Sequence, residues 1–556
     1  MMRTHRCGDL RAGHSGERVT LCGWVHSRRD HGGVTFIDLR DAAGLVQVVF
    51  GPDVSAEAHD AAQQLRSEFC IRIEGDVRPR PEGTVNPRLA TGDVEVAATS
   101  LEIFSASETP PFPIDEYQEV DEGLRLKYRY LDLRREHMAS NLRLRHAILA
   151  AIRRFFDAEG FVEIETPMLT RSTPEGARDY LVPSRVHPGC FYALPQSPQL
   201  FKQLFMVAGL DRYYQIVKCF RDEDLRADRQ PEFTQLDLEM SFVEVEDVLD
   251  VTERMFKQVW KEVLDVELPD FTRLSYADSM ERFGTDKPDS RFGMELVDLG
   301  DVFAATEVKV FASVLVAGGA VKGIVVPGRG DLGRKDLDAL VEEAKALGAG
   351  GLVWTAVTAD GLKSPLDKFF TDAERAGMLA TSGAGEGDLL LIVADARRSH
   401  VYKVLGALRT RLAERFELIP KLDRTDPDAW KFAWIVDFPW FEYNEDEARW
   451  DFIHHPFTGV VEDTLEYLET DPGKVMSKSY DITLNGWELA SGSIRIHDAD
   501  IQKRVFAALG IGEEEAEEKF SFLLTEFCYG VPPVCGIAAG IDRVVALAAG
   551  VRIFRV

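Results

Sequence analysis

The chain has 556 residues, of which 45% are hydrophobic and 28% charged, a composition typical of a globular protein with several domains. The formal net charge of −28 argues against nucleic-acid binding spread over the whole surface, because phosphates attract Lys and Arg, but local basic patches remain compatible with it. There is no apolar run of about 18 residues, which argues against a transmembrane helix, and the polar N-terminus predicts no signal peptide.

The seven cysteines are scattered along the chain and form no CxxC pair. This pattern argues against a disulfide framework and against a cysteine zinc site. We therefore expect a cytoplasmic protein without zinc.

Short strands are predicted across residues 17–104, where Val, Ile and Phe alternate with polar residues and Gly or Asp closes each run. One helical stretch, Ala56–Phe69, follows the third strand. Five strands with a helix after the third are the pattern of an OB-fold β-barrel, which commonly binds single-stranded nucleic acid; a generic small β-barrel is the alternative. We assign this domain to residues 1–105 and a proline-containing, acidic hinge to 106–125.

Residues 126–290 and 421–556 share dense clusters of charged and aromatic residues, whereas 291–420 is rich in Gly and Ala. We interpret the middle segment as an α/β domain inserted between two parts, 126–290 and 421–556, of another domain. A helix is also predicted at Asn141–Glu159, where apolar residues recur at near-helical spacing. Within the insertion we expect helices at Lys335–Leu347 and Lys403–Glu417 and short strands at GLVWTAV and LLLIVAD.

The strongest functional signal is the segment Cys219–Phe242. Arg221 closes an apparent strand, a charged loop follows, and a second strand alternates polar and apolar residues from Glu232 to Glu239. This pattern predicts an antiparallel hairpin with many polar groups on one face. Burying such groups together is costly unless they meet a polar ligand; a solvated hairpin with surface charges is the alternative.

A second signal is GIAAGIDRVVALAAG at Gly536–Gly550. Its small residues predict a tight strand, and Asp542 and Arg543 open an amphipathic helix. The small residues would let a flat ligand approach a rigidly held arginine; a well-packed helix with a solvent-facing arginine is the alternative.

Other patterns lack the context that would give them meaning. VMSKS at Val475–Ser479 is similar to a loop of class I synthetases, but no HIGH-type sequence accompanies it. No GxxxxGK[ST] sequence is present, which argues against a P-loop NTPase. His454 and His455 are adjacent, and adjacent residues of a strand point to opposite faces, which argues against a shared metal.

Three segments, in the expected order, resemble the motifs of class II aminoacyl-tRNA synthetases. They are a helix with EGFVEIETPML ending at Pro167, FRDE with its hairpin, and GIAAGIDR, in which Asp542 stands where many members have Glu. RSTPEGARDYLVPSR and FYALPQSPQLFKQLFMVAG narrow the resemblance to aspartyl-tRNA synthetases of the bacterial type, over nearly the whole chain. The resemblance implies an α+β multidomain protein: an N-terminal OB-fold anticodon-binding domain, a mainly antiparallel catalytic sheet and an inserted α/β domain.

The resemblance also implies an activity. Aspartate would be activated with ATP to aspartyl-adenylate and transferred to the 3′ end of tRNA(Asp), with tRNA(Asn) as a second candidate substrate, by a homodimer without membrane contact. Arg221 would bridge the α-phosphate and the substrate carboxylate, and Arg543 would hold the γ-phosphate, because a guanidinium fork pairs with two oxygens. Glu488, the third expected catalytic residue, would hold Mg²⁺ together with Asp481.

The remaining site residues follow from the same resemblance. Lys202 and Arg495 would distinguish aspartate from asparagine, whose neutral amide would leave both cations partly unpaired. The aspartate site would comprise Glu175, Ser197, Gln199, Lys202, Arg221, Gln235, Asp237, His454 and Arg495. The ATP site would comprise Arg221, Asp222, Glu223, Gln230, Glu488, Gly540, Ile541, Asp542 and Arg543.

In the barrel, the resemblance implies that Arg29, Gln47 and Glu95 read base edges of the anticodon. Phe36 would stack on a base; a place in the barrel core is the alternative for this residue. His31 and Gly83 resemble members of the family that also charge tRNA(Asn).

The sequence departs from the family at several places. It stops at GVRIFRV, where members usually continue, and we interpret this as a truncated tail. Val534 and Cys535 stand where His-Gly or His-Ala is usual, and Ala490 and Ser491 where glycines are common. An alternative is therefore a catalytically impaired RNA-binding or regulatory paralogue. An asparaginyl-tRNA synthetase, or an asparagine synthetase derived from this fold, is disfavoured by the barrel, the insertion and the Lys202 segment.

Overall fold

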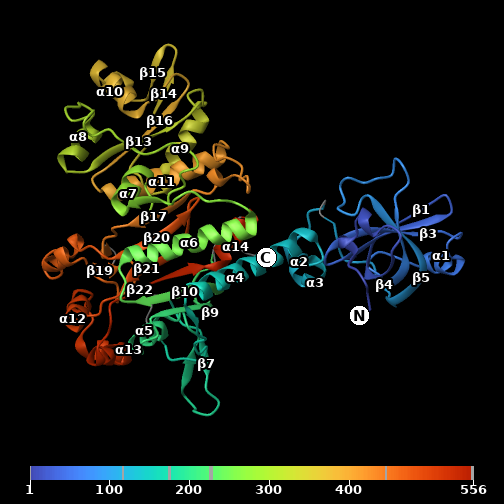
Figure 1. Cartoon of the computed structure of the whole chain (residues 1–556). Coiled ribbons are helices and arrows are strands. Elements are labelled where there is room, and N and C mark those ends of the chain that lie inside the picture. Colours follow the sequence, from blue (N-terminus) through green and yellow to red (C-terminus); the bar gives the residue numbers. More distant parts are fainter. Residues whose placement is uncertain (1, 116–117, 173–176, 225–228, 445–446, 552–556) are drawn as a thin grey trace. The chain divides into compact units, whose positions relative to one another are not determined.

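The computed structural model divides the chain into two compact units, Met1–Leu142 and Arg143–Val556 (Figure 1). None of its described helices is long and apolar enough to cross a membrane. The residues that the structure describes are 2–115, 118–172, 177–224, 229–444 and 447–551.

The first unit contains a closed five-stranded barrel with the strand order β1-β2-β3-β5-β4. Alternate residues of each strand point inward and form one apolar core, as the alternation in the sequence predicted. The barrel confirms the OB-fold prediction. Its elements are β1 (Arg18–His31), β2 (Val34–Asp41), β3 (Gly44–Phe50), α1 (Ala56–Ala62), β4 (Cys70–Pro79) and β5 (Val94–Ser105), preceded by η1 (Cys7–Asp9) and η2 (Ala12–His14).

The helix between β3 and β4 is shorter than predicted, because α1 ends at Ala62. Beyond it, the backbone of Glu68 takes a left-handed conformation with φ of 65°. Its amide donates to the carbonyl of Val25, 2.7 Å away, and the amide of Val25 donates to the carbonyl of Phe69. Pairing with β1 therefore overrides the local helical preference.

Helices connect the barrel to the second unit. The predicted hinge is followed by α2 (Glu122–Lys127) and α3 (Arg129–Asp132), and then by the long helix α4 (Glu136–Ala158). This last helix begins five residues earlier than the sequence predicted, and Gly160, with a φ of 76°, follows its end.

The second unit is built on an eight-stranded sheet. Only its outer pairs, β11 with β17 and β6 with β9, run parallel; the other neighbours are antiparallel, which confirms the predicted mainly antiparallel fold. The predicted strand in FVEIETPML shrinks to two residues. In sheet order the strands are β11 (Thr272–Ser275), β17 (Phe432–Val436), β20 (Ser479–Leu484), β21 (Trp487–Ile494), β22 (Val534–Gly540), β10 (Glu232–Ser241), β9 (Arg212–Phe220) and β6 (Val162–Glu163).

One face of this sheet is apolar and packs against helices α4, α6 (Val245–Leu264) and α14 (Ile541–Ala549) in a single core. In β10 the residues Leu236, Leu238 and Met240 point into that core. Because side chains alternate along a strand, the residues between them face the other side of the sheet. That second face is polar and carries the functional site.

The segment between β11 and β17 contains a five-stranded sheet of its own, with helices over both faces and two separate apolar clusters. This arrangement agrees with the α/β character predicted for the insertion. Its elements are α7 (Tyr276–Phe283), β12 (Val297–Asp298), α8 (Lys309–Val316), β13 (Ala320–Val326), α9 (Arg334–Ala346), β14 (Val353–Thr358), β15 (Gly361–Lys363), η3 (Asp367–Phe369), α10 (Asp372–Ser382), β16 (Leu389–Asp395) and α11 (Arg398–Arg415).

Smaller elements border the polar face of the large sheet. A hairpin of β7 and β8 precedes helix α5, and two helices, α12 and α13, precede β22. Their bounds are β7 (Leu181–Pro183), β8 (Phe191–Ala193), α5 (Gln199–Val207), η4 (Pro427–Ala429), β18 (Phe441–Asn444), β19 (Arg449–Phe452), η5 (Glu462–Tyr467), η6 (Pro472–Lys474), α12 (Ala499–Ala508), α13 (Glu513–Glu526) and η7 (Phe527–Tyr529).

Candidate active site

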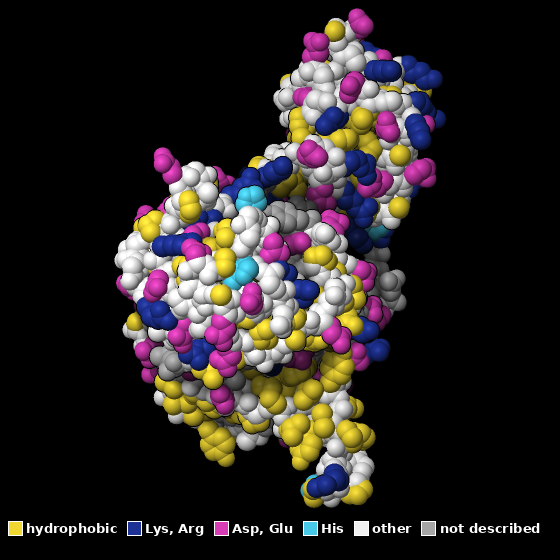
Figure 2. All heavy atoms as spheres, turned by 90° about the vertical axis from the view of Figure 1, so that its right-hand side faces the viewer, with side chains coloured by type: hydrophobic (Ala, Val, Ile, Leu, Met, Phe, Trp, Pro, Cys, Tyr) yellow, Lys and Arg dark blue, Asp and Glu magenta, His cyan; other side chains and the backbone are white. Residues whose placement is uncertain are grey.

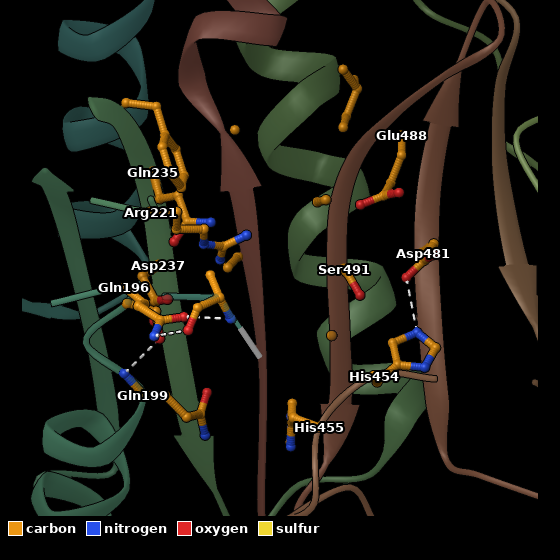
Figure 3. A pocket seen from close by; sticks show the side chains of 18 of the residues that line it. Gln196, Gln199, Arg221, Gln235, Asp237, His454, His455, Asp481, Glu488 and Ser491 are labelled. Atoms are coloured by element: carbon orange, nitrogen blue, oxygen red, sulfur yellow. Dashed lines mark hydrogen bonds and ion pairs between the residues drawn. The ribbon is translucent and has the colours of Figure 1, made fainter. Parts of the chain in front are cut away.

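A cavity of about 610 Å³ lies on the polar face of the large sheet. Its walls come from the hairpin β9–β10, strands β20 to β22, helix α5 and the bend after β19. In Figure 3, Arg221, Gln235 and Asp237 lie on one side of the cavity, and Asp481 and Glu488 lie on the other. Polar groups from distant parts of the sequence thus converge on one volume, as ligand sites commonly require.

Four buried charged side chains form a continuous network at one end of the cavity. The ammonium nitrogen of Lys202 lies 2.8 Å from Asp237 Oδ1 and 3.0 Å from Glu239 Oε2. The guanidinium of Arg495 donates to both oxygens of Glu239, at 2.9 and 3.1 Å. Two cations and two anions balance each other, which compensates much of the cost of removing them from water. We call these four residues the charge cluster.

The charge cluster follows from the local sequence. Asp237 and Glu239 are two residues apart on β10 and therefore share its polar face. Burial raises the pKa of Glu239, but Arg495 and Lys202 outweigh that effect, so its pKa lies below the ordinary value. For Asp237 burial prevails over Lys202, and its pKa is raised. Of the two anions, Glu239 is thus the one held more firmly in the ionised state.

Arg495 has further partners that fix its orientation. One of its terminal nitrogens donates to the hydroxyl of Ser493 at 2.7 Å and contacts the Nε2 atom of His455. Burial and then Arg495 hold the pKa of His455 well below its ordinary value. A neutral imidazole beside the guanidinium adds no second positive charge next to Arg495, so Arg495 meets no repulsion from His455.

A second group of charges occupies the opposite side of the cavity. Asp481 Oδ1 lies 3.4 Å from His454 Nε2, a contact drawn as a dashed line in Figure 3. Lys287 Nζ lies 2.8 Å from Glu488 Oε2. Burial raises the pKa of Asp481, and the nearby Glu488 adds to this effect. Burial also acts on Glu488, but Lys287 outweighs it and lowers its pKa. Two carboxylates on adjacent strands thus line the same side of the cavity, where a cation would relieve their repulsion.

Two arginines border the space between these groups. The guanidinium of Arg221 lies 5.1 Å from the ring centre of Phe233, and its buried Nε atom has no hydrogen-bonding partner among the described residues. A terminal nitrogen of Arg543 donates to the backbone carbonyl of Glu488 at 2.8 Å. Both side chains are oriented by the protein and line the cavity.

Asp542, in the first turn of α14, links that helix to two other parts of the second unit and is not a member of the charge cluster. Its carboxylate accepts hydrogen bonds from Arg145 at 2.6 Å and from the backbone amide of Thr234 at 2.8 Å. The first motif helix, the hairpin and the third motif are therefore tied together at this residue.

Most of the residues predicted for the aspartate, ATP and metal sites lie in the cavity wall, and two of the described ones do not. Glu175 lies outside the described residues, Asp222 has an exposed side chain outside the wall, and Ile541 is fully buried in the apolar core. The predicted residues in the wall are Ser197, Gln199, Lys202, Arg221, Glu223, Gln230, Gln235, Asp237, His454, Asp481, Glu488, Arg495, Gly540, Asp542 and Arg543.

The structure also reveals cavity and network residues that sequence reasoning missed. Glu239 binds both cations of the charge cluster, and its place two residues after Asp237 on one strand was the available signal. His455 lines the cavity together with His454, because both follow β19 in a bend rather than in the strand that we assumed. Lys287 pairs with Glu488 across 201 positions of sequence, and no local pattern predicts such a pair.

Three of the four candidate anticodon residues of the barrel lie in one hydrogen-bonded chain. Arg29 donates to Asp38 at 3.0 Å and to the side-chain oxygen of Gln47 at 3.4 Å, and Gln47 donates to Glu95 at 2.8 Å. Phe36 is half-buried and does not belong to the barrel core, so the alternative reading of this residue as a core residue was wrong.

His31 and Gly83 lie in turns of the same unit. His31 ends β1 and is exposed, directly before Gly32 and Gly33. Gly83 has a φ of 80° in the loop between β4 and β5. A residue with a side chain adopts this conformation only at a cost, which explains a glycine here.

Two family models match the chain. The model of class II tRNA synthetases (D, K and N) covers residues 121–555, and that of the OB-fold nucleic acid binding domain covers residues 19–104. An aspartate–tRNA(Asp/Asn) ligase of Caldanaerobacter subterraneus subsp. tengcongensis is 55% identical over 551 residues, which are 99% of this chain and 92% of the relative. The chain belongs to the aspartate–tRNA ligase family of class II tRNA synthetases.

Further comparisons agree with this family. An aspartate–tRNA(Asp/Asn) ligase of Desulfotalea psychrophila is 54% identical, with 99% of this chain and 90% of the relative covered. Among solved structures, the asparaginyl-tRNA synthetase of Pyrococcus horikoshii with asparaginyl-adenylate has a TM-score of 0.61 at 18% identity, covering 100% of this chain and 97% of that one. A putative aspartyl-tRNA synthetase of Leishmania major Friedlin has a TM-score of 0.59 at 20% identity, covering 98% and 90%. These last two likenesses concern the fold.

Proposed function

We propose that this member of the aspartate–tRNA ligase family activates L-aspartate with ATP and transfers it to the 3′ end of tRNA(Asp). The observation that carries the proposal is the charge cluster, which holds Lys202 and Arg495 rigidly at one end of a polar cavity. An aspartate side chain brings a negative charge to these cations. Asparagine has nearly the same shape, but its side-chain amide is neutral. Its binding would therefore bring no negative charge to the desolvated cations Lys202 and Arg495.

The rest of the aspartate molecule would meet the walls around the charge cluster. Ser197, Gln199 and Gln235 offer neutral hydrogen-bonding groups, and Asp237 offers an anion for the substrate ammonium group. His454 borders the same volume from the side of Asp481. We also assign Glu175 to this site by resemblance to the family.

ATP would occupy the part of the cavity between the hairpin and α14. Arg221 would contact the α-phosphate, because its oriented guanidinium retains an unused buried donor. Arg543 would contact the γ-phosphate, since the backbone of Glu488 fixes its position. We propose that Glu223, Gln230, Gly540 and Asp542 border the nucleotide, and that Asp222 and Ile541 support it from outside the cavity wall.

The reaction then requires positioning more than covalent chemistry. The α-carboxylate oxygen of aspartate attacks the α-phosphorus of ATP, the bond to the bridging oxygen breaks, and pyrophosphate leaves. Arg221, which would touch both reactants, brings them into line and stabilises the charge that develops on the α-phosphoryl oxygens. In the second step a ribose hydroxyl of the tRNA attacks the activated carbonyl carbon and AMP leaves.

We propose Mg²⁺ as the metal of this reaction, held by Asp481 and Glu488. Burial and, to a lesser extent, the nearby Glu488 raise the pKa of Asp481, and oxygen ligands suit Mg²⁺. No group of three or more His, Cys, Asp or Glu side chains in the described part of the chain forms a candidate metal site, which fits a metal bound jointly with ATP. Mg²⁺ would neutralise phosphate charge and orient the leaving pyrophosphate.

The activation step is tested by ATP–pyrophosphate exchange with aspartate or asparagine as the amino acid. Exchange that depends on aspartate and is at least about 100-fold weaker with asparagine is expected, given the charge difference. Equal exchange with both amino acids would contradict the role assigned to Lys202 and Arg495.

We propose that the barrel binds the tRNA anticodon through Arg29, Phe36, Gln47 and Glu95. Phe36→Ala is expected to raise the KM for tRNA(Asp) about tenfold, because stacking on a base contributes about 1–3 kcal/mol, while ATP–pyrophosphate exchange stays unchanged. Aminoacylation kinetics measure the first effect, and Phe36→Tyr, which keeps the ring, is the matched control. An unchanged KM for the alanine variant would remove Phe36 from the anticodon site.

We propose that His31 and Gly83 allow the protein to charge tRNA(Asn) as well as tRNA(Asp). Relatives named aspartate–tRNA(Asp/Asn) ligase support this extension. His31→Leu is expected to lower charging of tRNA(Asn) about tenfold relative to tRNA(Asp), the cost of about one recognition contact. Parallel charging of the two purified tRNAs gives the ratio, and wild-type charging of tRNA(Asp) alone would refute dual specificity.

We propose that the protein is a homodimer. Figure 2 shows hydrophobic side chains gathered at the lower end of the molecule, at the height of the β7–β8 hairpin in Figure 1, and exposed apolar patches of this kind mark interfaces. Phe191→Asp is expected to shift the sedimenting species to the monomer; Tyr443→Asp, at another exposed aromatic, is the control. A monomeric wild type would contradict the proposal. The exposed apolar residues of the β7–β8 hairpin are Leu181, Val186, Phe191 and Tyr192.

We propose the cytoplasm as its location. All seven cysteines are free in the structure, which suits a reducing compartment, and the ATP and tRNA of the proposed reaction are cytoplasmic reactants.

A further inference from the structure

Helix α13 ends in an acidic residue that is buried without a partner. Glu526 is 4% exposed, and neither of its carboxylate oxygens has a hydrogen-bonding partner among the described residues. On the same helix Glu517 and Glu518 are exposed. A buried carboxyl group without partners is costly in its ionised form, so it avoids ionisation near neutral pH.

The surroundings of Glu526 connect it to the charge cluster. Helix α13 packs against α5, which carries Lys202, and against α12 and η7. Burial and, after it, the negative charge of Glu239 raise the pKa of Glu526 to about 8. Of the charged groups around Glu526, Glu239 is the one that raises its pKa. The titratable or charged groups on α5, α12, η7 and β10 and directly after β21 are Lys202, Asp237, Glu239, Arg495, Asp500, Lys503, Arg504, Cys528 and Tyr529.

We propose that Glu526 is a positioning residue for substrate aspartate: as a neutral acid it preserves the charge balance of the cluster, and its ionisation weakens aspartate binding. The inference rests on the proposed function. Lys202 and Arg495 are already matched by Asp237 and Glu239. A further negative charge near Glu239 makes the site more repulsive toward the carboxylate of the substrate, because Lys202 and Arg495 already share their charge with Asp237 and Glu239.

The raised pKa of Glu526 decides how aspartate binding changes with pH. The pKa of Glu526 in the folded protein is raised, so the neutral form predominates below about 8 and the ionised form above it. Aspartate binding should therefore weaken as pH rises through 8. Glu526→Gln keeps the size of the side chain but cannot ionise, and it should lack this weakening.

The test measures the KM for aspartate in ATP–pyrophosphate exchange, at saturating ATP and Mg²⁺, from about pH 6.5 to 9.5. The ratio of the wild-type KM to that of Glu526→Gln is expected to rise about fivefold over this range, while the ratio of kcat values stays constant. Comparing the two proteins cancels the titration of the substrate itself. Glu517→Gln removes an exposed charge from the same helix and should follow the wild type at every pH.

If aspartate supports exchange in both proteins and their KM values for aspartate change in parallel with pH, the inference is wrong. Exchange that no protein supports at any pH would instead contradict the proposed function. Thermal unfolding provides a second readout that needs no substrate. The raised pKa means that the wild type should lose stability relative to Glu526→Gln as pH rises from about 4.5 to about 8, with no further loss above pH 8. A constant difference would equally overturn the inference.

Discussion

Replacing Arg221 with alanine is expected to lower kcat/KM for aspartate-dependent ATP–pyrophosphate exchange by about 10³-fold, because the loss of one oriented donor to a developing charge has effects of this order. Arg221 would contact both reactants. Its guanidinium lies beside the Phe233 ring, and its buried Nε–H has no acceptor among the described residues. The folded state should change little, since the guanidinium contacts the Phe233 ring and its buried Nε atom makes no hydrogen bond among the described residues.

Arg221→Lys is the matched control for this experiment. It keeps the positive charge but replaces the planar fork with a single ammonium group, which cannot bridge two groups in the same way. We expect it to retain only part of the lost activity. If Arg221→Ala exchanged pyrophosphate at a rate near that of the wild type, the assignment of the α-phosphate site would be wrong.

Replacing Arg495 with leucine is expected to destabilise the protein by about 3–5 kcal/mol and to abolish aspartate-dependent exchange. Removing one partner of a buried ion pair leaves the other charge uncompensated, and here Glu239 would retain only Lys202. The substrate carboxylate would lose one of its two expected cations. Urea unfolding measures the first effect and exchange kinetics the second.

Arg504→Leu is the control for this variant, because Arg504 pairs with Glu469 at the surface. Surface pairs contribute at most about 1 kcal/mol, so this variant should stay close to the wild type in both assays. An Arg495→Leu protein with wild-type stability would show that Glu239 does not depend on the arginine, and one with a wild-type KM for aspartate would exclude Arg495 from substrate binding.

Much of the fold could be predicted because local patterns decide it. Alternation of apolar and polar residues located the barrel strands and the hairpin β9–β10, and a strand's two faces then separate Leu236 and Leu238 from Asp237 and Glu239. The boundaries were less accurate. The end of α1 depends on pairing between Glu68 and β1, a contact that lies outside any local window.

The candidate site was predictable where a motif carries its residues. The resemblance brought Lys202, Arg221 and Arg495 together before the structure placed all three in one cavity wall. It did not indicate that Arg495 would rest against His455, because that contact depends on a bend after β19. The pairing of Lys287 with Glu488 joins the two sides of the insertion and needs the folded sheet.

The departures from the family pattern also acquire a structural meaning. Ser491 lies in the cavity wall next to Asp481, its cross-strand neighbour, and Ala490 contributes to both the cavity wall and the apolar core. Cys535 is buried, and its sulfur lies 2.9 Å from the hydroxyl of Tyr480. The side chains at these substituted positions thus have packing partners, and the charge cluster keeps both of its cations, Lys202 and Arg495.

The most direct test of the account is aminoacylation of purified tRNA(Asp) by the full chain with aspartate, ATP and Mg²⁺. We predict ester-linked aspartate at the 3′ end of the tRNA and release of AMP and pyrophosphate, with no comparable product from asparagine. A folded protein that binds tRNA(Asp) but forms no aspartyl-tRNA would contradict the central claim and would instead identify an RNA-binding paralogue of the same fold.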